Sequence, residues 1–204
     1  MEEKIEFSSG SFEIEGLLCK CSDDRGVVIA HPHPLYGGNM YNNVVMAISQ
    51  AYQKLGYTTL RFNFRGVGSS QGSYGDGIGE QEDVIAAIAY LADLGMKQID
   101  LAGYSFGAWV NGHLNCERAG IANMVMVSPP VAFIDFGSVG AIDCLKLVIT
   151  GSRDDIAPAE MIRQSYHKWN AAARLDVIDG ADHFYGGYED RLKDILTSNL
   201  KPQP

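Results

Sequence analysis

The sequence predicts an α/β fold in which a mostly parallel sheet of about eight strands is covered by helices on both faces. Short apolar or β-branched runs alternate with stretches whose apolar residues recur at helical spacing. One such run, residues 26–30, is continuously apolar, which is typical of a strand buried on both faces. The 204 residues contain no repeat and no low-complexity linker, so we expect a single domain with a frayed tail at 201–204.

The first half of the chain supplies five of the expected strands. Residues 5–7 and 12–19 can pair around a Ser-Ser-Gly turn. Apolar runs then predict strands at 26–30, 57–62 and 99–102. Helical spacing of apolar side chains predicts the intervening helices, at 43–55, at 79–94 and from 106 to about 115.

The second half repeats the alternation. Apolar runs predict strands at 123–127, 145–150 and 174–178. Pro158 fits the first turn of a helix that runs toward Trp169, because its missing N–H costs nothing there. A last helix is expected from about Gly187 to Leu200.

Composition limits the partners. The formal net charge of −9 argues against nucleic acid or an anionic membrane, since both reward clustered Lys and Arg. No stretch reaches the length of a membrane span, and the charged N-terminus lacks the apolar core of a signal peptide, so we expect a cytoplasmic protein, either monomer or homodimer. In a reducing compartment the four cysteines are predicted to be free thiols: Cys19, Cys21, Cys116 and Cys144.

Ser105 stands between a predicted strand and a predicted helix, within Gly103-Tyr-Ser-Phe-Gly107. A serine at such a corner has its hydroxyl pushed out of the sheet, and the flanking glycines permit the tight turn. The N-terminus of the following helix stabilises negative charge at the same place. Ser105 is therefore a candidate nucleophile.

Two further strand ends carry an acid and a base. Asp154 follows the 145–150 strand, and His183 follows the 174–178 strand. Sites in parallel sheets form at the carboxyl ends of strands, and a serine needs a base whose tautomer a carboxylate fixes. Nucleophile, acid and base are thus predicted as Ser105, Asp154 and His183. His113 and His167 fit less well, because both fall within predicted helices.

The loop after residues 26–30 is expected to help hold a developing oxyanion. The N–H of Phe106 should give one donor, and Leu35 is the first choice for the second, with His33 and Tyr36 behind it, because proline has no N–H. His31 and His33 could instead suggest a metal, but no acidic or cysteine partner lies nearby, so no metal is predicted.

The chain resembles the α/β-hydrolase superfamily, in particular its small, lidless members similar to dienelactone hydrolase. The resemblance lies in segments that span nearly the whole chain, residues 31–39, 61–69, 103–107, 151–158 and 181–184. It implies the α/β-hydrolase fold and a Ser-Asp-His triad at a nucleophile elbow. Arg65 and Ser69 resemble residues that brace this region in relatives. Dienelactone hydrolase itself has a cysteine nucleophile, so its particular reaction is not implied.

The expected protein is a cofactor-free serine hydrolase of small carboxylic esters or thioesters. Only about twenty residues separate Val127 from Leu147, too few for a helical cap, so the site should be open. Substrate contacts are predicted at Tyr36, Tyr104 and Pro130, the last within an apolar pocket wall at 129–134. Acyl transfer or amide hydrolysis on the same triad, or a non-catalytic binding role, remain alternatives.

Overall fold

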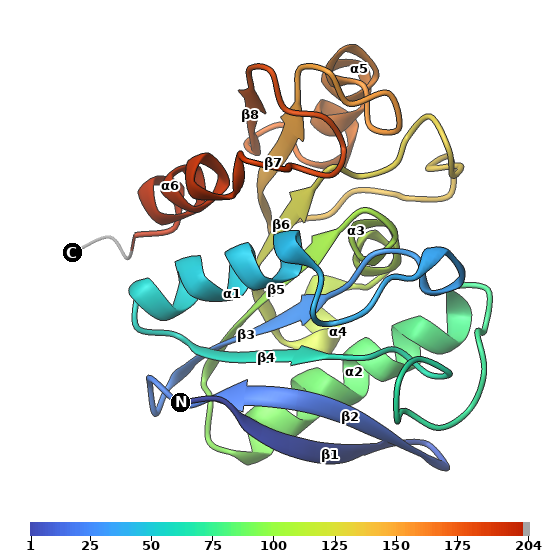
Figure 1. Ribbon diagram of the computed structural model, residues 1–204, viewed down its shortest axis with the longest axis vertical. Coiled ribbons are helices and arrows are strands. Elements are labelled where there is room, and N and C mark those ends of the chain that lie inside the picture. The colour runs from blue at the N-terminus through green and yellow to red at the C-terminus, as the bar shows by residue number, and fades with distance from the viewer. Residues whose placement is uncertain (202–204) are drawn as a thin grey trace.

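A computed structural model of the protein describes residues 1–201. It contains one eight-stranded sheet with the order β1-β2-β4-β3-β5-β6-β7-β8, in which only the pairs β1·β2 and β2·β4 are antiparallel (Figure 1). The eight strands are β1 (Glu3–Ser9), β2 (Phe12–Cys19), β3 (Arg25–Ala30), β4 (Thr58–Phe62), β5 (Gln98–Tyr104), β6 (Ile121–Val127), β7 (Leu145–Gly151) and β8 (Arg174–Ile178). This is the α/β-hydrolase arrangement that the sequence predicts.

Helices cover both faces of the sheet. On one face, α1 and α6 share a core with the buried sides of the central strands, and on the other face α2, α3 and α5 form a second core. The helical elements are the short 3₁₀ helix η1 (Pro34–Tyr36), α1 (Asn43–Lys54), α2 (Ile78–Asp93), α3 (Phe106–Gly112), α4 (Cys116–Ala119), α5 (Ala159–Trp169) and α6 (Glu189–Asn199). Within residues 1–201 none of them is long and apolar enough to cross a bilayer.

The predicted helix from 106 to about 115 corresponds to α3, which is shorter, and a separate helix α4 that was not predicted follows it. α3 ends at Gly112, and the side chain of Asn115 accepts a hydrogen bond from the Arg118 N–H, which caps the separate helix α4. Asparagine favours such a cap over a helix interior, because its side chain competes for backbone N–H groups.

Two of the four cysteines are paired. Cys116 and Cys144 form a disulfide, so the prediction of free thiols is wrong for them, whereas Cys19 and Cys21 are free. The two residues are 28 positions apart in the chain. Cys116 opens the helix that leads into β6, and Cys144 directly precedes β7. Because β6 and β7 are parallel neighbours, their amino ends lie together.

The carboxyl ends of the parallel strands remain uncovered. Residues 128–144, which connect β6 to β7, contain neither helix nor strand, so no cap lies there. Arg65 lies in the loop after β4, and its guanidinium donates to the buried Asp83 carboxylate at 2.8 Å. That ion pair joins the loop to α2. The Ser69 N–H donates to Glu15 at 2.7 Å. Both residues therefore brace this end of the sheet.

Candidate active site

Ser105 occupies the sharp corner between β5 and α3. Its backbone has φ 53° and ψ −119°, a conformation that L-residues rarely adopt. A Cβ on Gly103 would lie 2.6 Å from the Asn111 side chain, and one on Gly107 would lie 2.5 Å from the Ala30 carbonyl oxygen. Glycine at both positions therefore lets the strand, the corner and the helix pack closely enough to form this turn.

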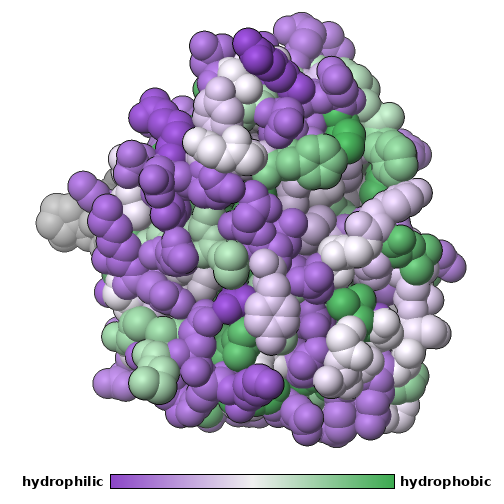
Figure 2. Space-filling model, in the orientation of Figure 1, coloured by the Kyte–Doolittle hydropathy of each residue, from purple (hydrophilic) through white to green (hydrophobic). Residues whose placement is uncertain are grey.

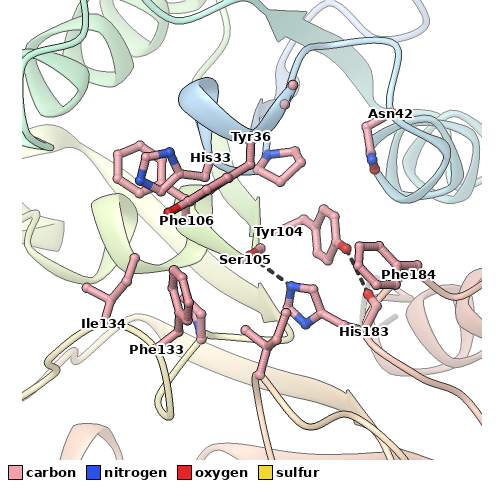
Figure 3. Close-up of a pocket in the computed structure, with 15 residues that line it drawn as sticks. His33, Tyr36, Asn42, Tyr104, Ser105, Phe106, Phe133, Ile134, His183 and Phe184 are labelled. Atoms are coloured by element: carbon pink, nitrogen blue, oxygen red, sulfur yellow. Dashed lines mark hydrogen bonds between the residues drawn. The ribbon is translucent and has the colours of Figure 1, made fainter.

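The structure brings Ser105, His183 and Asp154 into one hydrogen-bonded line. His183 Nε2 lies 3.0 Å from Ser105 Oγ, and His183 Nδ1 lies 2.9 Å from Asp154 Oδ2 (Figure 3). An ionised carboxylate only accepts, so Nδ1 carries the proton and Nε2 is left to accept from the serine hydroxyl. The three side chains come from β5, β7 and β8 ends that are far apart in sequence.

Asp154 receives hydrogen bonds on both carboxylate oxygens. Oδ1 accepts from the Ala157 N–H at 2.7 Å, and Oδ2 accepts from the Ser128 hydroxyl at 2.7 Å. Burial by itself raises the pKa of Asp154, but hydrogen bonds from His183, Ser128 and Ala157 outweigh it and hold the pKa below its ordinary value. The carboxylate is therefore ionised and fixed in orientation.

The line extends beyond Asp154 to a residue that the sequence did not indicate. Since Ser128 donates its hydroxyl proton to Asp154, its oxygen accepts from Tyr185, whose hydroxyl lies 2.8 Å away. Within residues 1–201 four non-glycine residues have positive φ, and three of them, Ser105, Ser128 and Tyr185, belong to this line. Such strain persists where the surroundings fix it, often at functional sites.

The loop after β3 is held by a buried histidine. His31 Nδ1 lies 2.6 Å from the Pro32 carbonyl and donates to it, while Nε2 accepts from the Phe64 N–H at 3.0 Å. Burial lowers the pKa of His31 to about 4, so the ring is neutral at neutral pH. Both ring nitrogens are engaged by backbone groups, which leaves none for a metal.

The backbone N–H groups of this loop differ in whether they already donate a hydrogen bond within the protein. The Leu35 N–H donates to His33 Nδ1 at 3.2 Å, and the Tyr36 N–H donates to the His33 carbonyl at 3.1 Å. In the described part of the chain, the His33 N–H makes no hydrogen bond. The geometry thus favours His33 over Leu35 and Tyr36 as the free donor of this loop.

Similarity to a relative and to solved structures places the chain in a family, although no model of a protein family matches it. An uncharacterized protein of Rickettsia prowazekii is 34% identical over an alignment of 194 residues that covers 89% of this chain and 82% of the relative. An α/β serine hydrolase homologue from Coxiella burnetii has 33% identity and a TM-score of 0.89, with 97% of each chain covered. The chain belongs to the α/β serine hydrolases.

A second solved structure resembles this α/β serine hydrolase and likewise has no lid. A serine hydrolase without a lid from Xanthomonas campestris has 26% identity and a TM-score of 0.89, with 100% of this chain and 97% of the other covered. The lack of a lid in that structure agrees with the absence of a cap from the connection between β6 and β7.

A pocket of about 410 Å³ opens above Ser105 in this hydrolase. None of its lining residues is Lys, Arg, Asp or Glu; they are Pro32, His33, Tyr36, Gly37, Gly38, Asn42, Tyr104, Ser105, Phe106, Pro130, Phe133, Ile134, Ile156, His183 and Phe184. Tyr36, Tyr104 and Pro130, the predicted substrate contacts, are among them, whereas Leu35 is not. The predicted wall at 129–134 contributes Pro130, Phe133 and Ile134.

Apolar side chains are exposed at the pocket mouth. Tyr36, Phe133 and Phe184 line the pocket yet remain mostly exposed. Hydrophilic side chains cover most of the face in Figure 2, and apolar ones gather toward the side where the strand-end loops lie in Figure 1.

Tyr104 lines the pocket and also contacts His183. Its hydroxyl donates to the His183 carbonyl at 2.7 Å and so holds the backbone of that histidine.

Proposed function

We propose that this protein hydrolyses small carboxylic esters through an acyl-enzyme formed on Ser105. The observation that carries the proposal is the hydrogen-bonded line from Ser105 through His183 to Asp154, of which Ser105 and His183 line the pocket. A serine hydroxyl becomes a nucleophile when a neighbouring base removes its proton, and that base works best when a carboxylate fixes its tautomer.

In the first half-reaction the Ser105 oxygen bonds to the ester carbonyl carbon as its proton passes to His183 Nε2. The carbonyl π electrons move onto oxygen, which gives a tetrahedral oxyanion. When the carbonyl re-forms, the bond to the alcohol oxygen breaks, and His183 Nε2 gives its proton to the departing alcohol. Asp154 stabilises the imidazolium while it exists.

In the second half-reaction water replaces the alcohol. His183 takes a proton from water as the water oxygen attacks the acyl carbon, and a second oxyanion forms. Its collapse breaks the bond to Ser105, which recovers its proton from His183. The products are one carboxylic acid and one alcohol, and the enzyme returns to its starting state.

The oxyanion accepts hydrogen bonds from the N–H groups of Phe106 and His33 in this proposal. Phe106 is the first residue of α3, where an N–H has no partner within the helix. The Pro32 carbonyl and the His33 N–H belong to one planar peptide and point in opposite directions. The hydrogen bond from His31 to that carbonyl therefore also orients the His33 N–H.

The uncharged pocket lining favours esters, and thioesters with uncharged leaving groups, over charged substrates. Acyl transfer and amide hydrolysis on the same triad stay alternatives to hydrolysis of esters. The net charge of −9 supports a small-molecule substrate rather than nucleic acid or an anionic membrane. Cytoplasmic placement and a monomer or homodimer remain predictions, and the Cys116–Cys144 disulfide weighs against a strongly reducing compartment.

A fluorophosphonate probe tests the proposal directly. Wild-type protein should be labelled and should hydrolyse p-nitrophenyl acetate, and Ser105→Ala should lose the label and roughly 10³-fold or more in turnover, since only binding and oxyanion effects remain. Thermal unfolding of the variant gives the control for folding. Wild-type protein that takes no label and cleaves no ester would show that the proposal is wrong.

A further inference from the structure

Aromatic rings around the pocket form two separate groups. One group, called here the ring wall, has His33 at its centre, with ring centroids 4.8 Å from Tyr36 and 4.6 Å from Phe106. The Tyr36 ring in turn meets the Phe133 ring edge-on at 6.0 Å. The ring wall is thus His33, Tyr36, Phe106 and Phe133.

The other group surrounds the catalytic histidine of the proposed mechanism. The Tyr104 and Phe184 rings lie 5.4 Å and 5.7 Å from the His183 ring. Within residues 1–201 no ring contact joins this group to the ring wall. Figure 3 shows Ser105 between them, with the ring wall and Ile134 to its left and His183 with Phe184 to its right.

The reaction determines which part of the ester faces which of the two groups of rings. His183 Nε2 must reach the oxygen of the departing alcohol in order to protonate it. The alcohol therefore lies on the side of His183, Tyr104 and Phe184. The acyl group extends to the opposite side of Ser105, against the ring wall.

The ring wall offers a wide apolar surface and no charge. Tyr36 and Phe133 are 73% and 62% exposed although both line the pocket, so a bound group can cover much of each ring. With no cationic side chain in the lining, an acyl group that carries a carboxylate or phosphate would be buried without a partner.

We propose that the acyl group of the substrate is an uncharged aromatic ring attached to the ester carbonyl, as in a benzoate ester, and that Tyr36 and Phe133 determine this specificity. The inference rests on the proposed ester hydrolysis. A flat ring pairs with the two wall rings edge to face, a gain that an aliphatic group of equal size does not have. A rigid ring also loses less conformational freedom on binding than an alkyl chain.

The test compares p-nitrophenyl benzoate with p-nitrophenyl cyclohexanecarboxylate, which share a leaving group and a carbon count. Each kcat/KM is divided by the rate constant of hydroxide-catalysed hydrolysis, which removes the intrinsic reactivity of the ester. Wild-type protein should prefer the benzoate roughly fivefold, the size expected from two ring pairs at about 0.5 kcal/mol each. Tyr36→Leu and Phe133→Leu should each reduce this preference to about twofold or less, because leucine keeps the apolar contact and removes the ring.

Phe184→Leu is the matched control, since Phe184 is a similarly exposed pocket ring on the side of the alcohol. It should leave the benzoate preference unchanged even if it alters both rates. A wild-type enzyme that cleaves both esters without preference overturns the inference and leaves the proposed function standing. So does a preference that survives in both wall variants or is lost equally in Phe184→Leu. Failure to cleave either ester while p-nitrophenyl acetate is still cleaved overturns this inference alone, whereas failure to cleave the acetate as well overturns the proposed function.

Discussion

At the scale of single residues, Ser128 connects the candidate triad to the protein interior. Its hydroxyl donates to Asp154, and it accepts from Tyr185. Ser128→Ala removes one donor from a buried carboxylate, and a hydrogen bond to a charged group contributes about 1.5–3 kcal/mol. Because the carboxylate then no longer holds the His183 ring in one orientation, we expect kcat to fall roughly tenfold or more with little change in KM.

The pH profile separates this effect from a general loss of structure. With one donor fewer, the Asp154 carboxylate stabilises the imidazolium of His183 more strongly, so the pH of half-maximal kcat should move upward. Tyr185→Phe keeps the ring and removes only the hydroxyl, and should give a smaller shift in the same direction. A pH profile unchanged in Ser128→Ala would contradict the positioning role.

The adjacent acids Asp154 and Asp155 provide a second residue-scale prediction. Asp154 is buried and hydrogen-bonded to His183, whereas Asp155 is exposed and makes no side-chain hydrogen bond or ion pair within residues 1–201. Asp154→Asn should reduce kcat by about 10⁴-fold, because the amide favours the wrong imidazole tautomer. Asp155→Asn should stay within about twofold. Equal losses in ester hydrolysis would contradict the assignment.

Residue type and strand-end position were enough to predict that Ser105, Asp154 and His183 meet. They could not predict which loop N–H is free, since the donor pattern depends on the His33 ring, which captures the Leu35 N–H. Ser128 also follows a strand end, but serine is common there. Its positive φ and its hydroxyl contacts, which mark it, are visible only in three dimensions.

At the scale of elements, the crossing of α3 over β3 depends on Gly107. A Cβ there would lie 2.5 Å from the Ala30 carbonyl oxygen and 2.8 Å from that of His31, and backbone atoms cannot move aside as a side chain does. Gly107→Ala should lower the free energy of unfolding by about 1–3 kcal/mol and displace the corner that carries Ser105.

Chemical denaturation measures this loss, and ester hydrolysis reports the displacement. Gly140→Ala is the matched control, because Gly140 is exposed and a Cβ there would meet nothing within 4 Å. It should change stability by less than about 0.5 kcal/mol. Equal stability of the two variants would contradict the close-packing argument.

The periodicity of the sequence predicted every strand of the sheet, because buried parallel strands leave a strong apolar signal. The observed strand ends differ most from the predicted ones where the apolar pattern is weakest. The polar edge strand β1 is an example, since it covers Glu3–Ser9 rather than residues 5–7. The short helix α4 and the Cys116–Cys144 disulfide were missed. Each depends on a local cap or on strand adjacency that apolar spacing does not encode.

At the scale of the whole molecule, the buried Asp100 makes stability depend on pH. It is 1% exposed in the centre of β5, where burial raises its pKa to about 6, although Asn123, Lys146 and Tyr52 favour the ionised form. Between about pH 4 and pH 6 the unfolded chain has lost this proton while the folded chain keeps it. This carboxyl therefore contributes a loss of stability as the pH rises through that range.

Asp100→Asn isolates this contribution, because other titrating groups are shared by both proteins. His31, whose lowered pKa gives the opposite slope between about pH 6.5 and 4, cancels in the difference. The stability of the variant relative to wild type should increase from pH 4 to pH 6 by an amount on the order of 3 kcal/mol, about two pKa units at 1.36 kcal/mol each. Denaturation at several pH values measures it, and a difference independent of pH would contradict the assignment.

The absence of a cap over the strand ends predicts how the enzyme should respond to acyl length. Each methylene buried in a tunnel contributes about 0.8 kcal/mol, which would raise kcat/KM roughly fourfold per carbon. The pocket is about 410 Å³ and its rim rings are exposed, so a straight chain leaves the covered surface after a few carbons. In a series of p-nitrophenyl esters, kcat/KM should rise only between about two and six acyl carbons and then level off or fall. A steady rise to twelve carbons would require a long apolar channel, which the connection between β6 and β7 does not build. The same limit explains why a compact ring, rather than a long chain, suits the ring wall beside Ser105.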